Sequence, residues 1–137
     1  EKALDLASYL PTDPSTPVAK TSDIFFRNGF REYTQGNFLR AKQQFEIVLQ
    51  MQPNHLMASL YLQNCENRIK EEVKSHLEIG KRSFDSGKLK DARGHFEAVL
   101  RLLHRNSEDP SFVEAKEQLA KVNAEISMMK ISDGGGG

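Results

Sequence analysis

Four histidines and one cysteine are the residues of this sequence best suited to metal binding or nucleophilic chemistry. His55, His76, His95 and His104 are spread over different predicted helices, and no carboxylate or cysteine stands at ligand spacing beside them. Because a metal site needs several donors that converge on one point, the sequence predicts no metal site. Cys65 lies among apolar neighbours in a helical pattern, so we expect a buried structural thiol rather than a nucleophile.

No other combination of residues suggests catalysis. The sequence contains no recognisable Ser-His-Asp set, paired carboxylates or glycine-rich phosphate loop. Gly134 to Gly137 follow a predicted helix at the end of the chain, without the strand and the lysine that a phosphate-binding loop needs. We therefore expect a protein that is not an enzyme and that uses no cofactor.

Composition and charge argue against two further classes of partner. The 137 residues include 19 Lys plus Arg and 19 Asp plus Glu, so no overall field attracts nucleic acid or anionic lipid. No apolar run reaches the roughly 20 residues of a membrane span, so we expect no direct membrane insertion. The single cysteine favours a reducing, cytoplasmic location. One run of basic residues is expected to form a solvated helix face, and contact with nucleic acid is the alternative. This run consists of Lys88, Lys90, Arg93, Arg101, His104 and Arg105.

An internal repeat organises the chain. Seven positions recur with a spacing of 51 residues, and most of the pairs are identical. The pairs are Gly29/Gly80, Gly36/Gly87, Phe38/Leu89, Ala41/Ala92, Phe45/Phe96, Val48/Val99 and Leu49/Leu100. Self-similarity of this kind is the mark of a repeat architecture.

Helical periodicity and breaker residues predict an all-α fold. Thr21 or Ser22 would cap a first helix that ends at Gly36, and a second helix would end at Pro53. Asn54 would cap a long third helix over residues 55–86, because neither proline nor a glycine other than Gly80 interrupts it; a break near Glu71 and Glu72 is the alternative. Two more helices are expected over residues 88–104 and 110–129, the latter started by Asp109 and Pro110.

The predicted organisation has three parts. Residues 1–20 form an N-terminal segment, of which 11–20 is a linker with prolines at positions 11, 14 and 17. Residues 21–130 form the helical domain, and residues 131–137 form a flexible glycine tail. Leu4 to Leu10 could order only by docking on another surface, since so short a helix is marginal alone.

The stretch from Ser22 to His55 resembles a tetratricopeptide repeat, a helix-turn-helix unit of about 34 residues. The resemblance places Gly29 opposite Ala41, Phe45 across the helix pair, and Pro53 at the end of the unit. Val73 to about Asn106 resembles a second unit. Both units depart from the family pattern in places. The first has Phe25 at the position of the usual tryptophan and Asn28 at that of a leucine. The second has His76 at the position of a large residue and lacks the final proline. Two tetratricopeptide-like hairpins would share the long central helix, and the last helix would cap them.

Tetratricopeptide arrays bind peptides on the concave face formed by their opening helices. Transferred by position, the resemblance implies a peptide-binding groove lined by Phe26, Phe30, Tyr33, Thr34, Leu60, Asn64, Asn67, Lys74, Leu77 and Lys81. Phe26 and Phe30 replace the polar residues of a carboxylate clamp, which favours an apolar groove.

The function expected is that of a non-catalytic protein–protein interaction module, a scaffold or signalling adaptor that binds a peptide or helix of a protein partner. The alternative is self-association, in which a second copy or the segment from Leu4 to Leu10 covers the groove. The apolar excess of the first helix supports either interpretation, because one two-layer unit buries only part of it.

Overall fold

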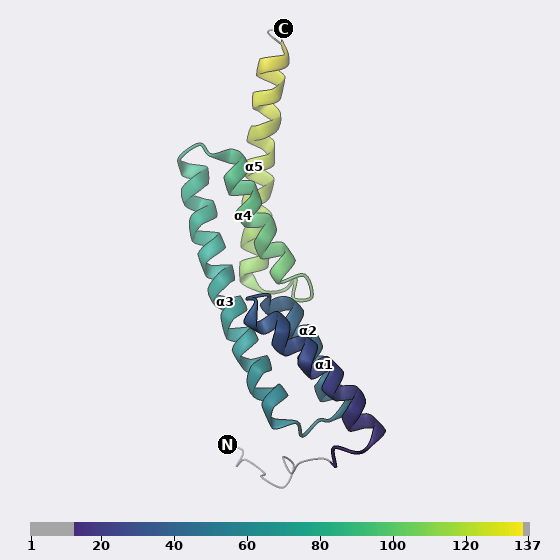
Figure 1. Cartoon of the computed structure of the whole chain (residues 1–137). Coiled ribbons are helices and arrows are strands. Elements are labelled where there is room, and N and C mark those ends of the chain that lie inside the picture. Colours follow the sequence, from purple (N-terminus) through teal and green to yellow (C-terminus); the bar gives the residue numbers. More distant parts are fainter. Residues whose placement is uncertain (1–12, 136–137) are drawn as a thin grey trace, which may run out of the picture. The chain divides into compact units, whose positions relative to one another are not determined.

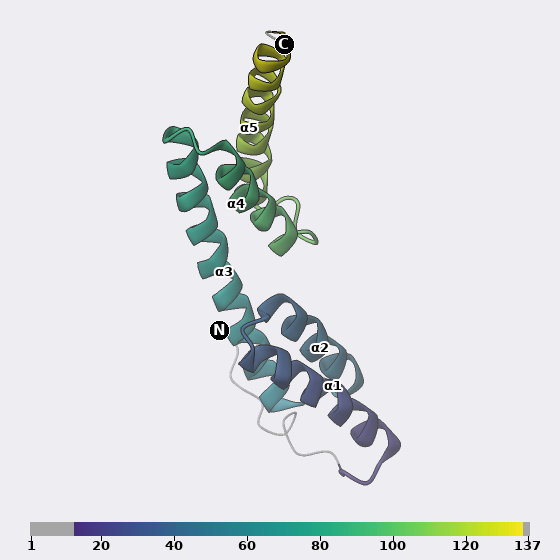
Figure 2. The same ribbon diagram turned by 45° about the horizontal axis from the view of Figure 1, so that its top comes forward.

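The protein is all-α in the part of the chain that the structure, a computed structural model, describes: residues 13–135, with side chains to residue 131. Contacts divide the chain into two compact units, Glu1–Ile69 and Lys70–Gly137, whose boundary falls within the third helix. In Figures 1 and 2, α1 lies beside α2 and α4 lies beside α5. The helices are α1 (Pro17–Thr34), α2 (Phe38–Met51), α3 (Leu56–Asp85), α4 (Leu89–Leu102) and α5 (Pro110–Gly135).

The first helix begins earlier than the sequence analysis predicted. Thr16 caps α1 by accepting a hydrogen bond from the N–H of Ala19, and Pro17 occupies the first turn. Proline is favourable there because its missing N–H has no partner at a helix start. Residues 17–20 of the predicted linker are therefore helical, and neither Thr21 nor Ser22 is the cap. Residues 1–12, which include Leu4 to Leu10, lie outside the described part.

The third helix is continuous over 30 residues, and no break occurs at Glu71 and Glu72. His55 rather than Asn54 caps it: the N–H of Ala58 donates to the His55 Nδ1 at 3.0 Å. The start of α5 confirms the predicted signal, since the N–H of Ser111 donates to the Asp109 carboxylate. Its end differs, because α5 continues past Met129 through Gly135, so residues 131–135 are helical rather than tail; residues 136–137 are not described.

The turns after α1 and α3 share one conformation. Gly36 and Gly87 have φ angles of 82° and 79°, the left-handed region that side chains rarely enter. Beside each glycine the following N–H reaches back into the helix: Asn37 donates to the Glu32 carbonyl at 2.9 Å, and Lys88 to that of Ser83 at 2.8 Å. This is the Schellman ending, and it fixes where each hairpin turns.

The other repeated glycine lets the second helix of each pair pack closely on the first. A Cβ at Gly29 would lie 2.8 Å from the Phe45 ring, and one at Gly80 would lie 2.7 Å from the Phe96 ring. Both rings are fully buried. The Phe45 ring fills the space beside Gly29, and Ala41, which was expected opposite Gly29, is fully buried on the same helix as Phe45.

One buried pair differs between the units. In the N-terminal unit the Ser22 hydroxyl, near the start of α1, donates to the side-chain oxygen of Gln52, which follows the end of α2. The residues at the same repeat positions in the C-terminal unit are Val73 and Leu103, which cannot form this bond. A buried hydrogen bond fixes relative helix position more specifically than apolar contact does.

Candidate binding surfaces

Tyr61 is the centre of an aromatic cluster in the N-terminal unit. Its ring stacks on Phe45, with centroids 5.5 Å apart, and meets the edges of three rings of α1. The centroid distances from Tyr61 are 6.1 Å to Phe26, 5.6 Å to Phe30 and 5.0 Å to Tyr33. Tilted ring contacts of this kind stabilise an arrangement beyond the apolar area that they bury. The structure therefore brings together the three aromatic residues of α1 that the sequence analysis selected.

The outer side of this cluster is an apolar surface. Phe30 is 42% exposed, and Met57 and Leu60 are each 47% exposed on the first turns of α3. Met57 lies one turn before Tyr61 on α3, and Leu60 lies three residues after Met57, so both are near the residue that Phe30 contacts. We refer to Phe30, Met57 and Leu60 as the α1–α3 apolar surface.

Phe26 and Tyr33 belong to the base of this surface. Phe26 is half-buried, and its ring stacks on that of His55 with centroids 5.1 Å apart. Tyr33 is half-buried against Phe38. Tyr61, whose ring meets Phe30 edge-on, also contacts the rings of Phe26 and Tyr33, so Phe30 lies against a packed aromatic cluster.

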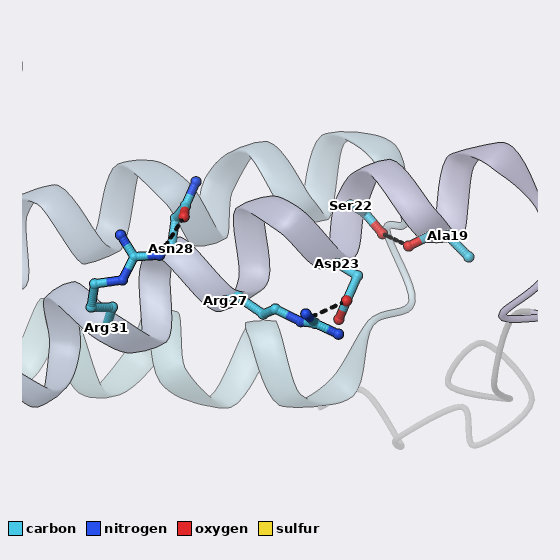
Figure 3. A network of polar contacts seen from close by, with 6 residues as sticks. All are labelled: Ala19, Ser22, Asp23, Arg27, Asn28 and Arg31. Carbon is cyan, nitrogen blue, oxygen red and sulfur yellow. Dashed lines mark hydrogen bonds and ion pairs between the residues drawn. The ribbon is translucent and has the colours of Figure 1, made fainter.

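Polar side chains lie along α1 next to the apolar residues. The Arg27 guanidinium pairs with the Asp23 carboxylate at 2.8 Å, and Arg31 donates to the Asn28 side-chain oxygen at 3.0 Å (Figure 3). The Thr34 hydroxyl is already used, because it donates to the Arg31 carbonyl. Asn64 and Asn67 are exposed on α3. These groups can supply orientation more readily than affinity, since exposed ion pairs contribute little.

The three candidate residues of the C-terminal unit line one pocket. Lys74, Leu77 and Lys81 are among the walls of a pocket of about 460 Å³ between the second half of α3 and the start of α5. Val73, Leu77 and Leu103 form its apolar floor. The Lys81 ammonium pairs with the Glu114 carboxylate at 2.7 Å, and Glu78 also lines the pocket. Leu77 is buried, so the lysines rather than Leu77 are the accessible part of this site.

Sequence reasoning missed two residues of the N-terminal surface. Tyr61 is the residue that the other rings of the cluster contact, and Met57 belongs to the exposed apolar surface. Neither was among the expected binding residues. The available signal was spacing, because Met57, Leu60, Tyr61 and Asn64 recur at intervals of three and four residues on one helix face.

Two histidines of the C-terminal unit contact each other. The Nδ1 atoms of His76 on α3 and His95 on α4 are 2.9 Å apart, so one ring must donate and the other accept. Burial lowers the pKa of His76, and electrostatic interactions with His95 and Arg101 lower it further. Among the described residues, no group of three or more His, Cys, Asp or Glu side chains is placed to hold a metal ion.

Acidification is expected to destabilise the fold through His55 and His76. Burial lowers the pKa of both below the ordinary value of 6.5, so the unfolded chain binds more protons than the folded one. The stabilisation is complete above pH 6.5 and is lost as the pH falls toward the folded pKa values. A protonated His55 can no longer accept from Ala58, and two protonated rings cannot share the His76–His95 bond.

Urea denaturation at pH 7.5, 6.5 and 5.5 measures this loss. The control variant is His55→Asn/His76→Phe, in which Asn keeps a capping oxygen and Phe is the residue of the matching repeat position, Phe25. Between pH 7.5 and 5.5, we expect the free energy of unfolding of this variant to fall less than that of the wild type. An equal fall in both proteins would contradict the role assigned to these histidines.

Cys65 is fully buried on α3, as its pattern predicted. Burial raises the pKa of its thiol to about 11. The thiolate that nucleophilic chemistry needs is therefore rare at neutral pH.

Comparison with known proteins adds no relative. The chain matches no protein-family model, and neither curated proteins nor solved structures give a match. In the described part of the chain, none of the helices combines the length and apolar character that crossing a membrane requires.

Proposed function

We propose that the chain is a non-catalytic protein–protein interaction module of the tetratricopeptide type, which binds a peptide or helix of a protein partner through the α1–α3 apolar surface. The observation that carries this proposal is the exposure of Phe30, Met57 and Leu60 above the packed rings of Phe26 and Tyr61. Exposed apolar patches mark interaction sites, and aromatic residues and methionine are enriched in protein interfaces.

The repeated glycine–phenylalanine contacts support the assignment to this repeat type. Small residues at Gly29 and Gly80 receive the rings of Phe45 and Phe96, and both hairpins turn at a left-handed glycine. Units of this kind stack through their helix faces and leave one face for a ligand.

A double substitution on the exposed side tests the proposal. Peptides are selected from a displayed random library on the wild-type chain, and their affinity is measured for Phe30→Ala/Leu60→Ala. We expect the variant to bind at least tenfold more weakly, because each substitution removes apolar area from the contact with the peptide. Phe26→Ala is less suitable, since Phe26 also packs on His55 and Tyr61.

The matched control is Val113→Ala/Met128→Ala, which removes two exposed apolar side chains from α5. This control should keep the wild-type affinity, and both variants should keep the wild-type free energy of unfolding within about 1 kcal/mol. Peptides that bind the Phe30/Leu60 variant as well as the wild type would overturn the proposal.

Self-association is a second candidate, favoured by the apolar end of α5. Met128, Met129 and Ile131 are 58–73% exposed there. Sedimentation velocity over a hundredfold range of concentration separates the two functions. A concentration-dependent dimer that Met128→Lys/Ile131→Lys dissolves would support self-association, and a monomer throughout would exclude it.

A further inference from the structure

The repeat extends to the third helix of each unit, which allows the two units to be compared position by position. Ala58 and Cys65 on α3 match Ala115 and Val122 on α5 in spacing, and all four are fully buried. Ile69 and Ile126 continue the series at the same offset. This offset exceeds that of the hairpins because the connection before α5 is longer and because α5 begins earlier relative to its matching alanine. Phe38 matches Leu89 by the hairpin spacing of 51 residues.

In the N-terminal unit, the first position of α2 holds an aromatic ring, Phe38. The Phe38 ring is buried at the start of α2, against the edge of Tyr33, with centroids 5.5 Å apart. The guanidinium of Arg68, on α3, lies 4.8 Å from the ring centroid of Phe38. In the N-terminal unit, the first position of α2 therefore holds an aromatic ring that a cation covers.

The C-terminal unit has a pocket at the matching place. Leu89 replaces the ring, and Glu125 stands where the repeat has Arg68. A pocket of about 510 Å³ opens between the start of α4 and the end of α5, with an apolar floor of Leu89, Ile126 and Met129. This volume lies in the range of sites that hold small ligands or side chains.

The edge of this pocket is basic. Lys88, Lys90 and Lys130 line it and are exposed, and none forms an ion pair with another described residue. Asp91 is the one carboxylate among the lining residues. Three unpaired ammonium groups around an apolar floor, in a chain with no net charge, favour a partner that is acidic at this point.

We propose that this pocket receives an aromatic side chain from an acidic stretch of a partner protein. The ring would take the place that Phe38 occupies in the N-terminal unit, with Leu89 and Met129 against its faces. The lysines would pair with the flanking carboxylates, and one ammonium could cover the ring as Arg68 covers Phe38. The pocket lies on the C-terminal unit and does not involve Phe30, Met57 or Leu60, so this inference stands apart from the proposed function.

Two peptides and one filling substitution test the pocket. The probe is acetyl-Glu-Glu-Phe-Glu-Glu-amide, its control has Ala in place of Phe, and binding is followed by the methyl resonances of Met129 and Leu89. We expect the Phe peptide to shift both resonances and the Ala peptide to bind at least tenfold more weakly. Leu89→Phe places in the C-terminal unit the ring that the N-terminal unit has at this position. It should abolish binding because the ring fills the pocket, and it should preserve or raise the free energy of unfolding as cavity-filling changes do.

Two further variants keep the test decisive. Met129→Glu changes an exposed side chain and should also abolish binding, so the result does not depend on the folding of Leu89→Phe. Phe30→Ala/Leu60→Ala should leave binding of the probe unchanged, which separates this pocket from the α1–α3 apolar surface. Equal binding of the Phe and Ala peptides, no shift at Met129 with either, or full binding to Leu89→Phe would overturn the proposal.

Discussion

Replacing Phe45 or Phe96 by alanine is expected to lower the free energy of unfolding by about 3–5 kcal/mol. Each ring is fully buried and fills the space above a glycine, so its removal leaves a cavity that backbone alone surrounds on one side. Phe45→Ala should be the more costly change, because Phe45 also packs on Phe26 and Tyr61.

Hydrogen exchange measured by mass spectrometry tests this prediction separately in each unit. Phe45→Ala should speed exchange in α1 and α2, and Phe96→Ala should speed exchange in α4 and the second half of α3. Phe84→Ala, which truncates a half-exposed ring on α3, is the milder control. Losses below about 1 kcal/mol in both variants would show that these rings do not carry the packing assigned to them.

The second large effect concerns the glycine beneath each ring. Gly80→Ala should cost about 1–3 kcal/mol, because the new Cβ would lie 2.7 Å from a carbon of the Phe96 ring. Helix propensity alone would give the opposite sign, since alanine is favoured over glycine by up to about 1 kcal/mol. Steric overlap therefore decides the direction at this position.

A double-mutant cycle isolates that overlap. In a Phe96→Ala background the ring is absent, so Gly80→Ala should become neutral or stabilising. Gly94→Ala is the matched control, because a Cβ at Gly94 meets nothing within 4 Å and the residue lies within α4. If Gly80→Ala has the same effect with and without the Phe96 ring, the contact does not explain the repeated glycine.

Local signals predicted the hairpins well because the signals are short-ranged. Gly36 and Gly87 end their helices in the left-handed conformation that their positions required, and Asp109 with Pro110 starts α5. The continuous α3 followed from the lack of any breaker. The start of the first helix was predicted too late because Pro17 was taken as a linker residue, whereas it stands in the first turn of α1 after the Thr16 cap.

The surfaces were harder to predict because they depend on how neighbouring helices are rotated. Periodicity selected Phe26, Phe30 and Tyr33 as one face of α1, but it could not show that Tyr61 of α3 meets all three. Similarly, periodicity selected Lys74, Leu77 and Lys81 but could not show that all three line one pocket in which Leu77 is buried. The pocket at Leu89 became evident only when the matching contents of the two units were compared.

The divergence between the two units gives each a different surface. In the N-terminal unit aromatic rings fill the places next to the helix pair, and the exposed remainder is apolar. In the C-terminal unit smaller aliphatic residues leave two pockets, both edged by lysines. A repeat that keeps its glycine–phenylalanine contacts can therefore change its surface without changing its fold.

The most direct test of the proposed function is a titration of the methyl-labelled chain with a peptide selected on it, followed by NMR. We predict that the methyl resonances of Met57 and Leu60 shift in a saturable way, that those of Met128 do not move, and that Phe30→Ala weakens the shifts at least tenfold. Saturable shifts confined to other methyl groups, with Met57 and Leu60 unmoved, would contradict the assignment of the α1–α3 apolar surface as the binding site.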